Sequence, residues 1–556
     1  MSRRDVLELD WPELSRAVGG RLVRVASPLQ PCLTNPGGTE CAAALVASGN
    51  PFFLQDEPGG FQTTGWHGAF TARHSPYAVV PETTSDVVGA VTFARDHGVG
   101  LVLKGTGHDY MGRSSDPASL LIWTHHMRGV TVHESFAPAG SDVDAGLPAV
   151  TVEAGTRWLE AYHAVSTRGR YVTGGGCTSV GAAGGFTQGG GFGSFSTRFG
   201  TTAGNVLELE VVTADGEILV ANATQHPDLF WALRGGGGGT FGVVTKVTMR
   251  TYDPPETMGG VFGTITARDD TTYRQLVRQI VALVPRLDDE HWGEQIRFGP
   301  DNSVELMMAF LDLSDDEARS VWRPVLDWVD RRAGALSTDV VIASGPFHDF
   351  WDARRWDEAA PDMIHRDTRP GQSADHFWWA SNDGEVSSYI NAYHSRWLPR
   401  HLFEASPDRL AEALFDASRH SPFGLHMNKG LSGAAVEATA RDRTTSVNPA
   451  VFDAATLLIM DSAQVHAFPG VPGHEPDPDL AASQARRIGQ AMTVIRDITP
   501  GAGAYVNQAD YFEEDWQDSF WGTNYPRLVE VKRRYDPSNL FCVHHGVGSE
   551  KRAAGR

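Results

Sequence analysis

The stretch Thr173–Phe195, TGGGCTSVGAAGGFTQGGGFGSF, is the most informative part of the sequence, because ten of its residues are glycine. Glycine adopts positive φ angles and lets the backbone lie against a ligand, but it weakens helices and strands. A flexible linker is the alternative interpretation. Linkers favour glycine and serine, whereas apolar side chains such as Val180, Phe186 and Phe192 are interleaved here. We therefore interpret the stretch as backbone that wraps a ligand.

Two further glycine-dense stretches, 104–115 and 235–242, favour a ligand with phosphate groups. Successive backbone N–H groups in such turns form concave sites for anions. The GxGxxG pattern of Gly237–Gly242 follows an expected helix and precedes an expected strand, which reverses the order of the dinucleotide-binding fingerprint. Lys104 stands before the glycines of its turn, so that turn is not a P-loop. We expect a phosphate-bearing cofactor bound without a Rossmann motif.

A β-α-β pattern leads into the first glycine-rich turn. Tyr77–Val80 and Val99–Leu103 are expected strands, because both are short apolar runs. The helix between them is expected to begin at a cap formed by Thr84 or Ser85 and to end at Gly98.

The chain is long enough for more than one domain. Its 556 residues exceed the roughly 250–300 at which a single core stops growing, and Asp253-Pro254-Pro255 is the clearest boundary. Beyond it, strands alternate with amphipathic helices, which favours a sheet with helices on one face. Residues 1–70 are expected to hold a short helix, Trp11–Val18, and then irregular chain. The predicted domains are residues 1–255 with a core at 73–253, residues 256–499, and a C-terminal segment, 500–556, that returns to the first domain.

The formal charge of −21 and the pI of about 5.4 argue against a nucleic-acid or anionic-membrane partner. The sequence has no run of roughly 18 apolar residues that would predict a membrane span. Residues 1–18 have no apolar segment typical of a secretory signal. These observations predict a cytoplasmic protein, a monomer or homodimer, that acts on a small molecule.

Four cysteines are present, and none of them forms a CxxC pair, so no metal site is expected. Cys32 and Cys41 are close enough in sequence for a disulfide, but two free thiols are an equally open alternative.

Aromatic residues concentrate between positions 340 and 400, and two interpretations remain open. They either form part of the hydrophobic core or line a pocket for an aromatic or hydrophobic substrate. These residues are Phe347, Phe350, Trp351, Trp356, Phe377, Trp378 and Trp379.

Three motifs occur in a fixed order: KGTGHDYMG at 104–112, GCTSVG at 176–181 and DLFWALRGGGGGTFGVVT at 228–245. A fourth group follows near the C-terminus, at Trp521-Gly522, Asn524-Tyr525, Arg527-Leu528, Val531-Lys532 and Tyr535-Asp536-Pro537. Together they resemble the berberine-bridge-enzyme-like FAD-linked oxidases of the vanillyl-alcohol-oxidase (p-cresol-methylhydroxylase-type) superfamily, in particular a bacterial and fungal subgroup. The resemblance implies an α+β fold. It consists of a p-cresol-methylhydroxylase-type FAD-binding domain of two α/β subdomains and a substrate domain whose antiparallel sheet is covered by helices.

The resemblance implies FAD attached through two side chains. His108 matches the histidine that carries the 8α link, and Cys177 matches the cysteine of the 6-S link. Considered alone, either residue is more often structural. The full set of expected cofactor-binding residues is Lys104, Gly105, Thr106, Gly107, His108, Asp109, Gly112, Ser114, Cys177, Val180, Gly181, Gly184, Gly185, Gly190, Gly191, Gly193, Gly242, Val243, Val244, Tyr505, Asn507 and His545.

The family's Y-x-N-Y-x-D motif reads Tyr505-Val506-Asn507-Gln508-Ala509-Asp510 here. Gln508 replaces a tyrosine that assists proton removal in sugar-oxidising relatives, and a glutamine cannot take that proton. The expected catalytic residues are Tyr505, Asn507, Gln508 and Asp510. Further candidate bases are Tyr389, His394, His426, Tyr511 and His545.

The resemblance implies an oxidase that removes a hydride from an alcohol, an amine or a benzylic or allylic carbon and reduces O2 to H2O2. Val180 stands at a position that the family associates with oxygen access to the flavin. Two alternatives remain open: a flavin dehydrogenase with another electron acceptor, and a non-catalytic protein of this fold that binds a metabolite.

Overall fold

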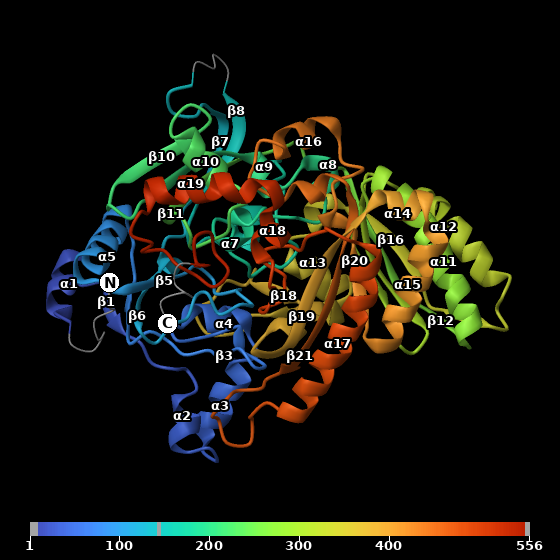
Figure 1. The fold of residues 1–556 in the computed structure, drawn as a ribbon, viewed down its shortest axis with the longest axis horizontal. Coiled ribbons are helices and arrows are strands. Elements are labelled where there is room, and N and C mark those ends of the chain that lie inside the picture. The colour runs from blue at the N-terminus through green and yellow to red at the C-terminus, as the bar shows by residue number, and fades with distance from the viewer. Residues whose placement is uncertain (1–8, 142–145, 551–556) are drawn as a thin grey trace.

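The computed structural model describes residues 9–141 and 146–550 (Figure 1). The first eight residues, on which part of the targeting prediction rests, lie outside this range. Among the described residues, no helix is long and apolar enough to cross a membrane.

The first sheet has the strand order β1-β4-β6-β5. Three of its strands are parallel and β1 is antiparallel. The strands are β1 (Leu22–Arg24), β4 (Tyr77–Val79), β5 (Gly100–Lys104) and β6 (Ser119–Trp123). Helix α5 (Thr84–His97) connects β4 to β5, as the sequence predicts. Thr83 rather than Thr84 or Ser85 caps this helix, because its hydroxyl accepts from the Asp86 N–H in a capping box. Gly98 ends the helix at a φ of 68°.

The second sheet is fully antiparallel and has the strand order β10-β9-β11-β8-β7. Its strands are β7 (Val130–Phe136), β8 (Leu147–Glu153), β9 (Val206–Val212), β10 (Ile218–Asn222) and β11 (Val243–Arg250). The glycine-rich stretch lies in the segment between α6 (Trp158–Ser166) and β9. The helices of this segment are short: α7 (Gly185–Gln188), α8 (Ser196–Phe199) and α9 (Thr202–Asn205).

Ten strands of the described chain form the third sheet, in the order β15-β12-β14-β13-β20-β21-β19-β2-β3, with β16 also paired to β12. Its strands are β2 (Thr63–Trp66), β3 (Phe70–Thr71), β12 (Thr257–Ala267), β13 (Gly293–Phe298), β14 (Ser303–Leu311), β15 (Leu336–Thr338), β16 (Val341–Pro346), β19 (Ser388–Pro399), β20 (Phe423–His426) and β21 (Ala454–Val465). The helices packed on it are α11 (Asp270–Asp289), α12 (Asp315–Asp330), α14 (Arg400–Ala405), α15 (Pro407–His420) and α17 (Pro478–Ile498), which Figure 1 shows together on one side.

The two faces of the third sheet have different roles. Val261 and Ile265 of β12 belong to the core beneath the helices, whereas Phe262 lines a cavity together with Met307 of β14. This alternation follows from the two-residue period of a strand. The sheet therefore presents one apolar face to the helices and the other to the cavity.

Residues 1–70 are more ordered than the sequence analysis predicts. Besides α1 (Trp11–Ala17), they contain α2 (Gln30–Thr34), α3 (Thr39–Ala47), α4 (Pro51–Asp56) and β2. Strand β2 pairs in parallel with β19 of the third sheet. Cys32 and Cys41 form a disulfide, which decides between the two alternatives left open by the sequence.

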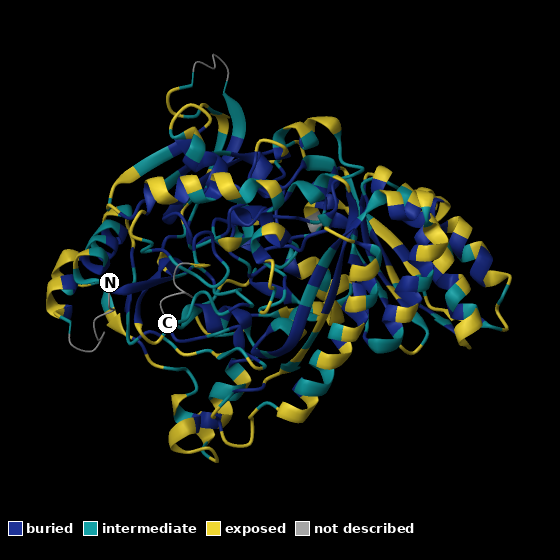
Figure 2. Ribbon diagram, viewed as in Figure 1, coloured by how far each residue is buried: buried dark blue, intermediate teal, exposed yellow. Residues whose placement is uncertain are grey.

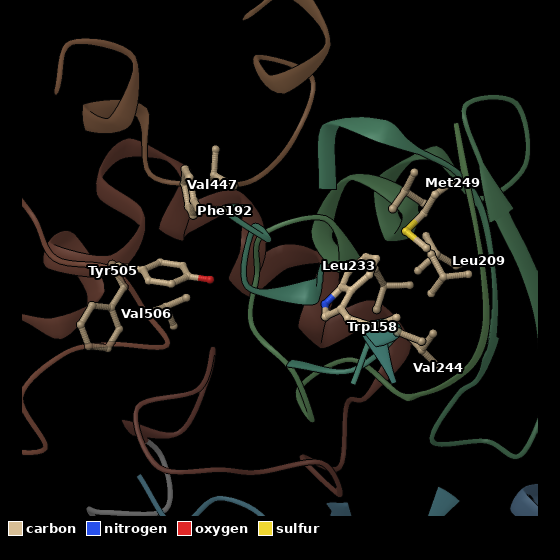
Figure 3. Close-up of a cluster of buried hydrophobic side chains, with 14 of the residues drawn as sticks. Trp158, Phe192, Leu209, Leu233, Val244, Met249, Val447, Tyr505 and Val506 are labelled. Carbon is tan, nitrogen blue, oxygen red and sulfur yellow. The ribbon is translucent and has the colours of Figure 1, made fainter. Parts of the chain in front are cut away.

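The C-terminal segment packs against the N-terminal half. Buried Lys532 of α19 (Tyr525–Tyr535) donates hydrogen bonds to the backbone oxygens of Thr240 and Phe541. Figure 3 shows Tyr505 and Val506 in the same buried cluster as Trp158 and Phe192. Figure 2 shows that the buried residues, in dark blue, are concentrated towards the centre of the molecule.

Candidate flavin and substrate site

One cavity of about 1430 Å³ lies between the glycine-rich loops and the third sheet. Its first wall comes from residues 103–109 and 174–185, and its second from β12, β13 and β14. A typical pocket for one small ligand measures roughly 300–1,000 Å³. This cavity therefore has room for a large cofactor and a substrate side by side.

His108 lines the cavity in the turn that follows β5. Its Nε2 lies 2.9 Å from Ser179 Oγ and 3.1 Å from Gln62 Nε2. Burial, and after it the charge of Arg157, lowers the pKa of His108 to about 4. The imidazole is therefore neutral near pH 7.

Cys177 is a free cysteine and lines the same cavity. Burial raises the pKa of its thiol well above the ordinary value, and the charges of Glu385 and Glu294 raise it further. The structure thus brings the two predicted flavin-linking residues to one cavity, although 69 positions separate them in sequence.

Most of the other predicted cofactor-binding residues also line this cavity. They are Lys104, Gly105, Thr106, Gly107, Asp109, Ser114, Val180, Gly181, Gly184, Gly185, Gly242, Val243, Val244, Tyr505 and Asn507.

Five predicted cofactor-binding residues fall outside the cavity lining: Gly112, Gly190, Gly191, Gly193 and His545. The first four are glycines for reasons of packing or backbone conformation. A Cβ on Gly112 would lie 2.6 Å from the Phe70 ring, and Gly190 and Gly191 have φ angles of 126° and 73°. His545 stacks on the ring of Trp516 at a centroid distance of 5.2 Å.

Lys104 contributes to the cavity wall, but its ammonium group is engaged elsewhere. Nζ donates hydrogen bonds to the carbonyl oxygens of Glu57, Pro58 and Gly60 at 2.9, 3.2 and 2.7 Å. Burial lowers the pKa of Lys104 to about 7, and the charge of Glu57 opposes that shift. The side chain therefore fixes the turn at residues 57–60 and is not directed at a phosphate.

The space around two glycines shows whether the loop has room for a closely bound ligand. A Cβ on Gly184 or Gly185 would meet no atom within 4 Å, and both residues line the cavity. Side chains there would enter space that backbone N–H groups leave open to a phosphate-bearing ligand. The loop therefore fits FAD held close to the backbone, and we expect the contact at Gly184 and Gly185.

Gly184→Val is expected to leave the fold intact and to weaken FAD binding at least about tenfold, because the new side chain occupies ligand space. Gly193→Ala is the matched opposite, since its Cβ would lie 2.1 Å from the Gly174 carbonyl oxygen. We expect it to destabilise the fold by about 2 kcal/mol or more. Thermal unfolding with and without added FAD separates the two effects. Normal FAD binding by Gly184→Val would contradict a close backbone contact.

The predicted catalytic residues Tyr505, Asn507 and Gln508 line the cavity, whereas Asp510 does not. Asp510 lies 3.7 Å from His394 Nδ1 instead. Burial raises the pKa of Tyr505 to about 12, although its hydroxyl accepts a hydrogen bond from Asn507 Nδ2 at 3.1 Å. This hydroxyl is therefore a poor base near neutral pH.

Among the further candidate bases, only His426 lines the cavity. Its Nδ1 lies 3.2 Å from Lys429 Nζ, and burial lowers its pKa well below the ordinary value. Tyr511 stacks on His544 at 3.7 Å instead, and Tyr389, His394 and His545 also fall outside the lining.

The cavity is also lined by carboxyl groups that no sequence motif marks, those of Glu294, Glu358, Glu385 and Asp461, of which Glu385 has the most defined contacts. Tyr110 Oη donates a hydrogen bond to Glu385 Oε2 at 3.0 Å, and the Tyr110 ring stacks on Tyr393 at 5.2 Å. Burial raises the pKa of Glu385, the Tyr110 hydrogen bond opposes this shift, and the charge of Asp461 adds to it. Tyr110 stands two residues after His108, which is a usable sequence signal; Glu385 has none.

Aromatic side chains form the wall beside Cys177. Phe350, Trp351, Trp356 and Trp379 line the cavity, with neighbouring rings 5.0–5.5 Å apart. Trp379 Nε1 donates a hydrogen bond to the Gly176 carbonyl oxygen at 2.9 Å. Phe377 and Trp378 are core residues, as the first interpretation of the aromatic stretch predicts. A substrate pocket formed by the aromatic residues that line the cavity stays a prediction.

These features match known families. Residues 75–222 match the family model of the FAD binding domain, and residues 504–548 match that of berberine and berberine-like proteins. Fold and site define a VAO-type flavoprotein with a p-cresol-methylhydroxylase-type α+β fold, and the chain belongs to the berberine-bridge-enzyme-like FAD-linked oxidoreductases.

The relatives span nearly the whole chain. FAD-linked oxidoreductase ZEB1 from Gibberella zeae is 32% identical, over 97% of this chain and 90% of its own length. The VAO-type flavoprotein MtVAO615 from Myceliophthora thermophila is 27% identical, with a TM-score of 0.77 over 97% of this chain and 95% of that one. A glucooligosaccharide oxidase from Acremonium strictum, described with 6-S-cysteinyl, 8α-N1-histidyl FAD, has a similar fold at 21% identity and a TM-score of 0.65, over 86% of this chain and 92% of that one.

Proposed function

We propose that this FAD-linked oxidoreductase is an oxidase. It removes a hydride from an alcohol, an amine or a benzylic or allylic carbon of a small ring-bearing apolar substrate and reduces O2 to H2O2. The observation that carries the proposal is the shared cavity, in which His108 and Cys177 face the aromatic wall and the third sheet. Bound FAD supplies the two-electron acceptor.

The residues of the cavity have separate tasks in this proposal. The glycine-rich loops hold FAD, and His108 and Cys177 attach it covalently. The aromatic wall at residues 350–379 binds the apolar body of the substrate. Val180, which lines the cavity, leaves the flavin accessible to oxygen.

Glu385 is the proposed base for the substrate proton. It lies in the cavity near Cys177, whose pKa its charge raises, and Tyr110 holds its carboxyl group. Gln508 cannot accept a proton, and the high pKa of Tyr505 makes its hydroxyl a poor alternative. A carboxylate fixed at a hydrogen-bond distance from the substrate can accept this proton.

Purified protein incubated in air with a panel of ring-bearing alcohols and amines tests the activity. Bleaching of the flavin by a substrate, followed by rapid recolouring with H2O2 formation, is the expected result. Slow recolouring in air with rapid reduction of an added dye would indicate a dehydrogenase instead. A flavin that no compound bleaches would contradict catalysis.

His108→Ala and Cys177→Ala should each retain one covalent link, and the double variant should retain none. Acid precipitation therefore leaves a yellow pellet for each single variant and a yellow supernatant for the double variant. Peptide mass mapping locates the remaining link. Cys542→Ala, which removes the other cysteine that is not part of the disulfide, is the control and should keep both links. Retention of both links in either single variant would contradict the assignment.

A further inference from the structure

The contacts of His108 distinguish its two ring nitrogens. Nε2 faces Ser179 Oγ at 2.9 Å and Gln62 Nε2 at 3.1 Å. Within the described part of the chain, the hydrogen bonds of His108 involve Nε2 and not Nδ1. Because one nitrogen is engaged and the other is not, the two are not equivalent as nucleophiles toward a flavin in the cavity.

The Gln62 amide is only partly satisfied. Its side chain is buried, and Oε1 has no hydrogen-bond partner among the described residues. A half-turn of the amide would bring Oε1 to Nε2 of His108. Gln62 can therefore donate to Nε2 in one orientation and accept a proton from Nε2–H in the other. The Ser179 hydroxyl can also act in both directions.

We propose that Ser179 and Gln62 are positioning residues that hold the proton of His108 on Nε2 and so direct flavin attachment to Nδ1. This inference rests on the proposed covalent FAD. Before attachment, Nε2–H donates to Ser179 Oγ and to the turned Gln62 amide, which leaves the Nδ1 lone pair free. After attachment, Nε2 accepts from the Ser179 hydroxyl and the Gln62 NH2 group. One pair of side chains thus fits both states of the imidazole.

Buried Arg157 stabilises this arrangement through hydrogen bonds that Gln55 relays to Ser179. Its Nε donates to Gln55 Oε1 at 2.7 Å, and Gln55 Nε2 donates to the Ser179 carbonyl oxygen at 2.7 Å. The guanidinium thereby fixes the Ser179 backbone, and its charge disfavours the protonated form of His108. A neutral imidazole is needed, because a protonated one has no lone pair with which to attack.

The bond-forming step balances with oxygen as the oxidant. Joining Nδ1 to the 8α-carbon replaces one C–H bond of the flavin methyl group and the imidazole N–H bond by a C–N bond. Two electrons and two protons are released. The electrons pass through the flavin ring to O2, which takes up both protons and leaves as H2O2.

The test uses the Cys177→Ala background, in which flavin can be attached only through His108. Covalent flavin is followed by acid precipitation after the addition of FAD, and total bound flavin is measured before precipitation. Ser179→Ala should bind FAD normally but attach it about tenfold more slowly, the effect of one lost hydrogen bond. Gln62→Met should act in the same direction, and Ser179→Thr should restore attachment because it restores the hydroxyl.

Thr178→Ala is the matched control. Its hydroxyl is equally buried but donates to the Phe377 carbonyl oxygen at 2.6 Å, so the variant should attach flavin at the parental rate. Attachment at that rate in Ser179→Ala, or NMR of the flavopeptide showing an Nε2 link, would overturn the inference. Absence of any His108 link in the parent would overturn the inference and the proposed covalent attachment together. Oxidation of a substrate by protein whose FAD is not covalently attached would show that the oxidase function depends on neither the inference nor the covalent attachment.

Discussion

Glu385→Gln should slow substrate-dependent flavin reduction by about 10²–10⁴-fold, the usual contribution of a general base. Glutamine preserves the shape of the side chain and can still accept the Tyr110 hydrogen bond that Glu385 receives at 3.0 Å. It cannot accept a proton. Stopped-flow reduction with a substrate identified in the panel measures this step separately from oxygen chemistry.

The pH dependence of the same step provides a second test. Burial raises the pKa of Glu385, so the reduction rate should fall as pH decreases through a midpoint above the ordinary glutamate value of about 4.3. Tyr110→Phe removes the hydrogen bond that favours the carboxylate, and the midpoint should move up. Asp461→Asn removes a nearby like charge, and the midpoint should move down. Lys429, Tyr393 and Cys177 also interact with Glu385 and are unchanged in both variants.

A large loss of rate in Asp461→Asn together with a small loss in Glu385→Gln would assign the base to Asp461. Burial also raises the pKa of Asp461, and it lines the same cavity. A reduction rate independent of pH in the wild-type enzyme would contradict a carboxyl base altogether.

The residues on the glycine-rich side of the cavity were predictable from the sequence, because their signals are local. The turn at residues 104–112 and the stretch Thr173–Phe195 have glycines where the backbone must lie close to a ligand or to another backbone segment, as Gly193 does against the Gly174 carbonyl oxygen. Motif order predicts that His108 and Cys177 bind one ligand, and the fold brings both to one cavity.

The substrate side was not predictable, because it is assembled from distant segments. Tyr110 and Glu385 are 275 positions apart, and no local pattern marks Glu385 as a cavity residue. Strand β2 shows the same limit for the fold. All four of its residues are buried, so it lacks the alternation by which a half-exposed strand is recognised. Its pairing with β19 depends on tertiary packing.

Asp56→Asn is expected to destabilise the fold by about 3 kcal/mol. Asp56 Oδ1 lies 3.0 Å from Nη2 of Arg157, a fully buried side chain, and Oδ2 lies 2.8 Å from Arg369. Removing one partner of a buried ion pair typically costs about 3–5 kcal/mol, because the other charge stays buried. Glu160, 3.5 Å from Arg157 Nη1, still compensates part of the Arg157 charge, so we expect a loss of stability at the lower end of this range. The denaturation midpoint measures the change.

The contribution of Asp56 should depend on pH in a defined direction. Burial alone would raise the pKa of Asp56, but the hydrogen bonds from His125 and Arg369 and the charge of Arg157 outweigh it and lower that pKa. A carboxyl group with a depressed folded-state pKa stabilises fully above its unfolded value of about 3.9 and loses this contribution as pH falls toward the folded value. The difference in stability between wild type and Asp56→Asn should therefore be largest near neutral pH and should approach zero in acid.

Asp253→Asn is the control. It breaks a pair between Arg170 and a carboxylate that is 94% exposed, and it should change stability by less than about 1 kcal/mol. Equal effects of the two substitutions would contradict a special role for the pair between Asp56 and the buried Arg157.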